Sequence, residues 1–162
     1  VHSFAEYSGT FYARFVKIHV VTWHEHIAMR AEIVCDDGCW IGREPPWVIE
    51  SSGTAEEKDG VKCEAANVLD PVAGLYWSPL VDVKTHFNRW YIVFDFKACY
   101  TLTRIRLVNC GDTTHDVKSF ILQKAACTKP YHWGDVLEVA KVKPGSKKPQ
   151  EFGCFSATAR YW

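Results

Sequence analysis

The stretch from residue 88 to residue 122 carries the pattern that most constrains the fold. Apolar residues alternate with other side chains over 90–96 and 103–108, and a third alternating run opens at Phe120. A period of two residues is typical of β-strands with one buried face. The short connection 97–101 and the polar connection 109–118 would be turns. We therefore predict three consecutive strands, the last two joined by an exposed loop.

Residues 16–33 predict a further pair of strands. Val16, Ile18 and Val20 alternate with polar residues, and a second alternating run covers 27–33 after a short polar segment. The simplest arrangement is a hairpin resting on a larger sheet. Glycine and proline then interrupt residues 36–46, so we place a boundary near residue 38, between segments 1–38 and 39–162.

The rest of the chain is also predicted to form short strands separated by turns. We expect strands at 47–49, 136–142 and 152–155, a polar loop at 51–60, and a helical turn or strand at 63–69. Many short strands and no long amphipathic helix indicate an all-β fold. The expected architecture is an antiparallel jelly-roll sandwich.

Charge and hydropathy exclude two classes of function. Nineteen basic residues balance nineteen acidic ones, and the one basic cluster, around residues 141–148, is interpreted as a solvated loop. Nucleic-acid binding needs a denser positive face, so no nucleic-acid partner is expected. No apolar run approaches the roughly 20 residues of a transmembrane helix, and no signal peptide opens the sequence. Either the protein is not exported, or the sequence is a segment of a longer processed chain.

The cysteine content leaves the redox state open. An odd number cannot pair completely within one chain. Two interpretations agree with this odd number. The cysteines are buried thiols in a reducing compartment, or the chain is an extracellular segment that lacks one pairing partner. The seven cysteines are Cys35, Cys39, Cys63, Cys99, Cys110, Cys127 and Cys154.

Residues 13–35 resemble the C-terminal end of a discoidin domain, the coagulation-factor C-type family. They contain an Ala-Arg-aromatic strand, Trp23-His24, a second strand with Arg30 and Glu32, and a closing Cys35. Residues 47–126 resemble the front and middle of the same family, including Trp90-Tyr-Ile-Val-Phe-Asp-Phe. The resemblance implies a galactose-binding-like jelly roll.

The family order is changed in this chain. Residues 155–162, Phe-Ser-Ala-Thr-Ala-Arg-Tyr-Trp, repeat the motif seen at 11–15, Phe-Tyr-Ala-Arg-Phe, so the parts follow one another as tail, front and middle. We expect segment 1–38 to complete one compact domain beside residues 136–142 and 152–155. Closure within one molecule is expected, and a strand-swapped dimer is the alternative.

The resemblance implies a ligand site on loops at one end of the sandwich, here 51–60, 82–89 and 109–116. Their polar side chains would bond a carbohydrate or a phospholipid head group, and nearby aromatic rings, including Tyr76, would stack on a sugar. Solvated loops and core aromatics are the alternative for each residue. The candidates are His86, Asn88, Arg89, Asp112, His115, Asp116, Trp77 and Trp133.

Metal and catalytic sites receive less support. Some carbohydrate-binding relatives hold a structural calcium, and Asp70 and Glu32 stand at the matching places. Apolar residues beside Asp70 make that site weak. Asp112, His115 and Asp116 lie close in sequence, but no zinc spacing or nucleophile motif accompanies them, so no enzyme is expected.

The leading hypothesis is a non-catalytic, extracellular or cell-surface recognition module. The alternative is a protein-interaction or structural module of a multidomain protein, for which an intracellular location also fits.

Overall fold

The structure, a computed structural model, describes residues 11–12, 15–23, 28–35, 44–70, 74–80, 90–125 and 129–162. Nearly all of its regular elements are strands in antiparallel pairs, so the predicted all-β class is confirmed. None of the helices in the described ranges could span a membrane. The elements are β1 (Phe11–Tyr12), β2 (Phe15–Trp23), β3 (Met29–Cys35), η1 (Pro45–Trp47), β4 (Val48–Ser51), β5 (Glu57–Lys58), β6 (Val61–Lys62), η2 (Ala65–Leu69), β7 (Trp90–Asn109), β8 (Val117–Ala125), β9 (Gly134–Val139), β10 (Gln150–Phe152) and β11 (Ala157–Tyr161).

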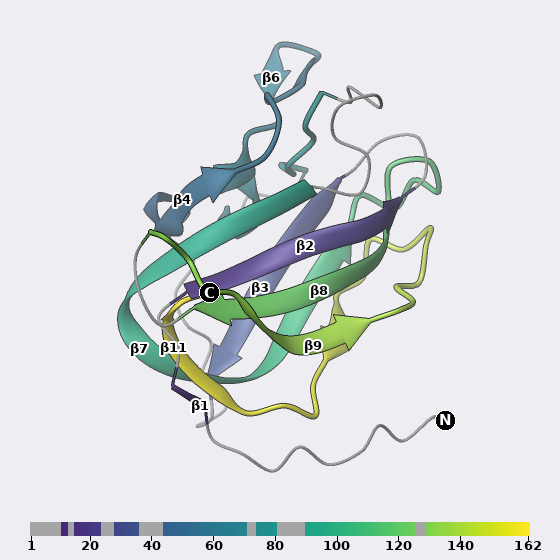
Figure 1. The fold of residues 1–162 in the computed structure, drawn as a ribbon. Helices are drawn as coiled ribbons and strands as arrows, with labels where there is room; N and C mark the ends of the chain where they lie inside the picture. Colours follow the sequence, from purple (N-terminus) through teal and green to yellow (C-terminus); the bar gives the residue numbers. More distant parts are fainter. Residues whose placement is uncertain are drawn as a thin grey trace.

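Strand β7 belongs to both layers of the fold (Figure 1). Its first half pairs with β2 and β4, its second half pairs with β3 and β10, and β11 pairs with residues on both sides of the bend. The predicted turn at 97–101 is therefore wrong. Lys97, with a φ of 64°, redirects the chain at a bend, and hydrogen bonding continues on both sides of it. The two strands predicted at 90–96 and 103–108 are one strand of 20 residues.

A buried carboxylate fixes this bend. Asp95 is 5% exposed and accepts hydrogen bonds from the Lys97 backbone N–H at 2.8 Å and from Arg160 Nε at 2.9 Å. Burial alone would raise the pKa of Asp95, but the hydrogen bonds from Arg160 and Lys97 hold it below its ordinary value. The Arg160 contact also ties β11 to β7.

Strands β2 and β3 do not pair with each other in the described part of the chain. β2 lies between β7 and β8, with Ile18 opposite both Ile92 and Leu122, whereas β3 pairs with the other half of β7. The predicted hairpin is therefore wrong. Each strand instead gains a longer partner than the other would provide.

The expected neighbours of these strands also differ. β9 pairs with β8 and β10 pairs with β7, so neither lies directly beside β2. The third strand expected at Phe120 is β8. Residues 63–69 contain a helical turn, the 3-10 helix η2.

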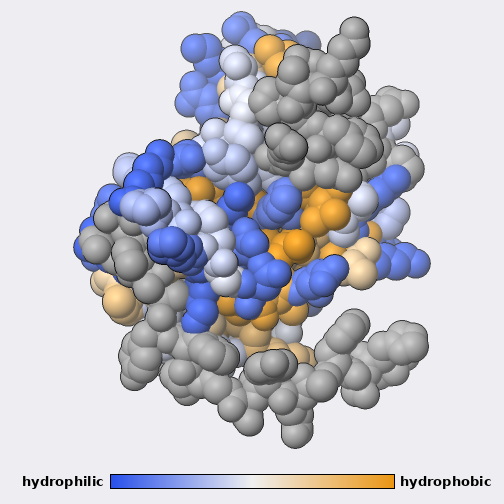
Figure 2. Space-filling view, viewed as in Figure 1, coloured by the Kyte–Doolittle hydropathy of each residue, from blue (hydrophilic) through white to orange (hydrophobic). Residues whose placement is uncertain are grey.

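Large aromatic side chains fill the space between the layers. Trp77, Trp90, Trp162, Phe94 and Phe120 are each at most 1% exposed. On the outer face formed by β2, β8 and β9, hydrophilic side chains are interleaved with hydrophobic ones (Figure 2). Because successive side chains of a strand point to opposite faces, one set of side chains enters the core and the other set lies on this outer face.

The bend in β7 brings both of its ends to one end of the molecule. Trp90 lies opposite Val20, and Asn109 lies opposite Met29. Val139, the last residue of β9, is paired with Phe120 in the same region. We call this region the loop end, and it comprises residues 52–63, 74–80, 110–116 and 140–149.

We expect Asp95→Asn to lower the free energy of unfolding by about 2 kcal/mol near neutral pH, because a buried charged hydrogen-bond acceptor is lost. The Asp95 pKa is lowered in the folded state, so its contribution is complete above the unfolded value of about 3.9 and disappears as pH falls through the folded value. Urea unfolding of parent and variant across acidic pH should show the difference closing.

Asp135→Asn is the matched control. Asp135 is exposed on β9 and accepts a hydrogen bond from Gln123, so its substitution should change stability by less than about 0.5 kcal/mol. Equal effects of the two substitutions at all pH values would contradict the role given to Asp95.

Candidate functional site at the loop end

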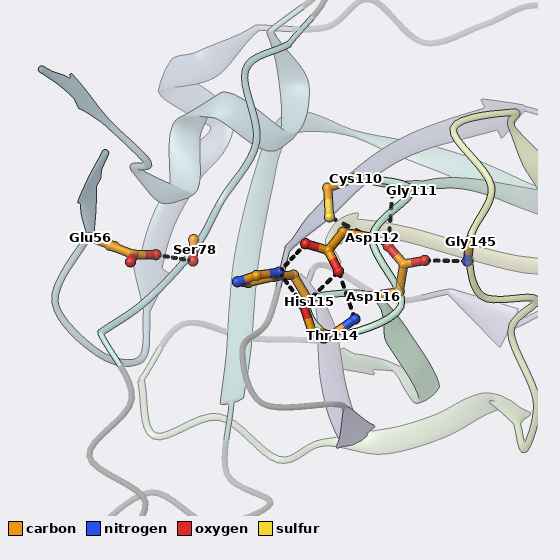
Figure 3. A network of polar contacts seen from close by, with 9 residues as sticks. All are labelled: Glu56, Ser78, Cys110, Gly111, Asp112, Thr114, His115, Asp116 and Gly145. Carbon is orange, nitrogen blue, oxygen red and sulfur yellow. Dashed lines mark hydrogen bonds and ion pairs between the residues drawn. The ribbon is translucent and has the colours of Figure 1, made fainter. Parts of the chain in front are cut away.

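Asp116 anchors the loop end from inside. It is fully buried, and its carboxylate accepts hydrogen bonds from the backbone N–H of Gly111 at 3.0 Å and of Gly145 at 2.6 Å (Figure 3). Cys110 Sγ lies 3.5 Å from the same carboxylate. These contacts hold 110–116 against 140–149. This buried position gives Asp116 a structural role, whereas the sequence predicted it as a ligand contact.

Asp112 and His115 form a separate pair nearer the surface. His115 Nδ1 lies 2.7 Å from Asp112 Oδ2 and 2.8 Å from the hydroxyl of Thr114. Hydrogen bonds from Thr114, together with His115, lower the pKa of Asp112 to about 2, so this carboxylate is charged at physiological pH. The three polar residues predicted together are thus divided between this pair and the buried anchor (Figure 3).

A second group of loops packs next to this one. Ser78 N–H donates to Cys63 O at 3.0 Å, Leu80 N–H donates to Thr54 O at 2.7 Å, and the Ser78 hydroxyl donates to Glu56 at 2.7 Å. These bonds fix 74–80 against 54–63. Two apolar side chains remain exposed here, Val61 at 47% and Leu80 at 54%.

A half-open pocket of about 470 Å³ lies between the loops. It combines an apolar wall with two cationic side chains, and its described lining contains no carboxylate. Arg30 is held in place by a 3.0 Å hydrogen bond from Nη2 to the carbonyl of Asp70. The stem of Lys147 crosses Gly111, whose φ of 81° and lack of a side chain permit this approach. The lining includes Arg30, Tyr76, Val108, Asn109, Cys110 and Lys147.

Two of these residues were missed by sequence reasoning. Arg30 appeared only as a polar position of an alternating strand, and Lys147 was assigned to a solvated cluster. Neither position carries a local signal, because the pocket forms only when β3, β7 and 140–149 come together.

The two tryptophans predicted to stack on a ligand do not lie together. Trp77 is 1% exposed and belongs to the core, which was the alternative interpretation. Trp133 packs against Tyr131, with ring centroids 5.0 Å apart, beside Lys17 on the outer face. It precedes Gly134, which pairs with Lys124 near the end of β8 remote from the loop end. Trp133 is thus separated from the pocket.

The remaining predicted residues are only partly described. His86, Asn88 and Arg89 lie outside the described residues. Glu32 lies on β3 opposite Arg106, but its side chain is not described. Asp70 ends η2, and its carbonyl accepts from Arg30. Within the described ranges no three His, Cys, Asp or Glu side chains gather as metal ligands.

The described cysteine side chains carry free thiols, namely Cys63, Cys99, Cys110 and Cys154. Burial raises the pKa of Cys110 to about 11 and also raises that of Cys63. Both thiols are therefore protonated at physiological pH, which gives them the low reactivity of structural cysteines.

Comparisons of the chain with protein-family models, curated proteins and solved structures gave no match.

We expect Asp116→Ala to destabilise the protein by about 3 kcal/mol, because the two glycine amides would lose a charged acceptor inside the fold. Chemical denaturation measures the effect. Asp112→Ala, in the same loop but at an exposed position, should cost clearly less. An Asp112 variant as unstable as the Asp116 variant would contradict the anchoring role.

We expect calcium to change the melting temperature little. The Arg30 guanidinium already occupies the Asp70 carbonyl, and a second positive charge there would be repelled. Thermal melts with calcium and with a chelator should nearly coincide. A large calcium-dependent rise that is abolished by Asp70→Ala would contradict this expectation.

Proposed function

We propose that this chain is a non-catalytic module that binds an anionic carbohydrate or lipid head group in the loop-end pocket. The observation that carries the proposal is that Arg30 and Lys147 both line one cavity, which also has an apolar wall. Such a cavity, with a few oriented polar groups, is typical of small-ligand sites. Two cations with no carboxylate among the described lining residues favour a negatively charged group.

The motif resemblance supports the same class of function. Discoidin-like jelly rolls are binding modules that use loops at one end, and the pairing of β7 brings several loops to one end here. We extend the proposal to the architecture, a jelly roll of discoidin type. The all-β class and the arrangement of β7 agree with it.

The exposed apolar residues make a lipid surface the favoured source of the anionic group. Val61 and Leu80 are both at the loop end, and each leaves about half of its side chain in water. Apolar side chains near cationic ones bind anionic membranes by adding buried apolar area to electrostatic attraction.

We expect the protein to bind vesicles of phosphatidylserine and phosphatidylcholine more tightly than vesicles of phosphatidylcholine alone. Lys147→Ala should weaken this binding about tenfold, equivalent to roughly 1.4 kcal/mol, by removing a charged contact. Higher salt should weaken the parent further because it screens the attraction. Vesicle co-sedimentation measures both effects.

Lys148→Ala is the matched control, because Lys148 is an exposed neighbour outside the pocket lining. It should bind nearly as well as the parent. Equal losses in the two variants would assign binding to general surface charge and reject the pocket. A glycan array in parallel would identify an acidic sugar as the source if vesicles fail, and binding to neither probe would overturn the proposal.

A further inference from the structure

Two segments that are distant in sequence occupy one strand position. β2 lies between β7 and β8 and runs antiparallel to both, and the end of β11, at Tyr161, pairs with the same two strands in the same direction. Tyr161 and Phe15 are both opposite Ala125. Trp162 exchanges backbone hydrogen bonds of 2.6 and 2.8 Å with Phe94, and Phe94 is also the register partner of Val16. The strand is therefore continuous in space and interrupted in the chain.

The interruption coincides with the repeated motif. Aligning Ala13-Arg14-Phe15 with Ala159-Arg160-Tyr161 places Phe11 beside Ala157 and Tyr12 beside Thr158. These are the partners in the parallel pair of β1 and β11. The two copies thus lie side by side in the same register at 11–12 and 157–158, and Phe15 and Tyr161 then share one partner, Ala125. Here β11 provides the first part of the strand and β2 provides the rest.

No backbone bond joins β11 to β2 at this joint. On that side β2 continues only into β1, which is itself held to β11 by strand pairing. The segment is a large part of the fold, because Ile18, Val20 and Met29 are all fully buried. Its other end is joined to η1 through residues 36–44. Fully extended, nine residues span roughly 30 Å, which is enough to reach an adjacent molecule.

We propose that the β2–β3 segment, residues 15–35, is exchangeable between two copies of this chain, each copy completing the strand that begins with β11 of the other. β1 is only two residues away from β2, so it moves with the segment and pairs with β11 of the other copy. Exchange re-forms the same contacts in both copies, so its net cost is mainly the entropy of association, and high protein concentration favours it.

The exchange would also make the pocket a shared site. Arg30 lies on β3 within the segment, whereas Tyr76, Asn109 and Lys147 belong to the remainder of the chain. In an exchanged dimer each pocket takes its arginine from the second copy. The exchange itself does not depend on what the pocket binds.

A cross-linking experiment on the full chain tests the exchange. Thr22 of β2 and Ser119 of β8 are register partners whose hydroxyl oxygens are 2.6 Å apart, so cysteines at these positions are in disulfide range. Unlabelled Thr22→Cys protein and nitrogen-15-labelled Ser119→Cys protein would be unfolded together, refolded at millimolar concentration and oxidised. Mass spectrometry should then find peptides that join residue 22 of one isotope to residue 119 of the other.

Thr101→Cys and Thr158→Cys provide the matched pair. Their hydroxyl oxygens are also 2.6 Å apart, but both positions lie outside the β2–β3 segment and stay in one copy on exchange. This pair should give no mixed-isotope link. A chain carrying both Thr22→Cys and Ser119→Cys verifies that the bond forms within a folded monomer. Absence of the mixed 22–119 link when that chain does cross-link, or equal mixed links in both pairs, would overturn the proposal.

Discussion

Both layers of this protein depend on one strand and on the carboxylate that bends it. β7 supplies partners to β2 and β4 before the bend, to β3 and β10 after it, and to β11 on both sides of it. A strand can change layers only if its polar groups at the corner are satisfied. Asp95 meets this need by accepting from the Lys97 amide and from Arg160, and the aromatic core closes between the two halves.

The same bend positions the loops around the proposed ligand pocket. Because β7 starts and finishes at one end of the molecule, the described loops 74–80 and 110–116 lie at that end. The Asp116 carboxylate is buried and accepts hydrogen bonds from the backbone amides of Gly111 and Gly145. Arg30 and Lys147 are left facing the pocket, and this charge distribution supports a site for an anionic group.

The joint between β11 and β2 connects assembly to this site. A strand made of two segments keeps its pairing whether the segments come from one molecule or from two, since hydrogen bonds and buried side chains do not distinguish the source. Arg30 lies on the segment that can be exchanged. An exchange that conserves the fold would therefore take the residues of each pocket from two copies without changing the contacts inside it.

The sequence by itself determined the strands and their buried faces. Alternation identified β2, β7 and β8 and placed Ile18, Phe94 and Phe120 inside, because the two-residue period of a strand depends only on local geometry. The repeated motif at residues 11–15 and 155–162 was also visible. Local patterns likewise marked 110–116 as a polar loop, although they did not separate the buried Asp116 from the exposed Asp112.

Partner choice was decided only by the tertiary structure. An alternating segment pairs equally well with many others, so the sequence predicted a hairpin for β2 and β3 and a turn where β7 continues through a bend. The residue type of Trp77 suggested a ligand contact, but the fold places its side chain in the core. Arg30 and Lys147 become a site only because pairing between distant strands brings them together, and the free energy of that pairing comes from buried area and hydrogen bonds that no single segment contains.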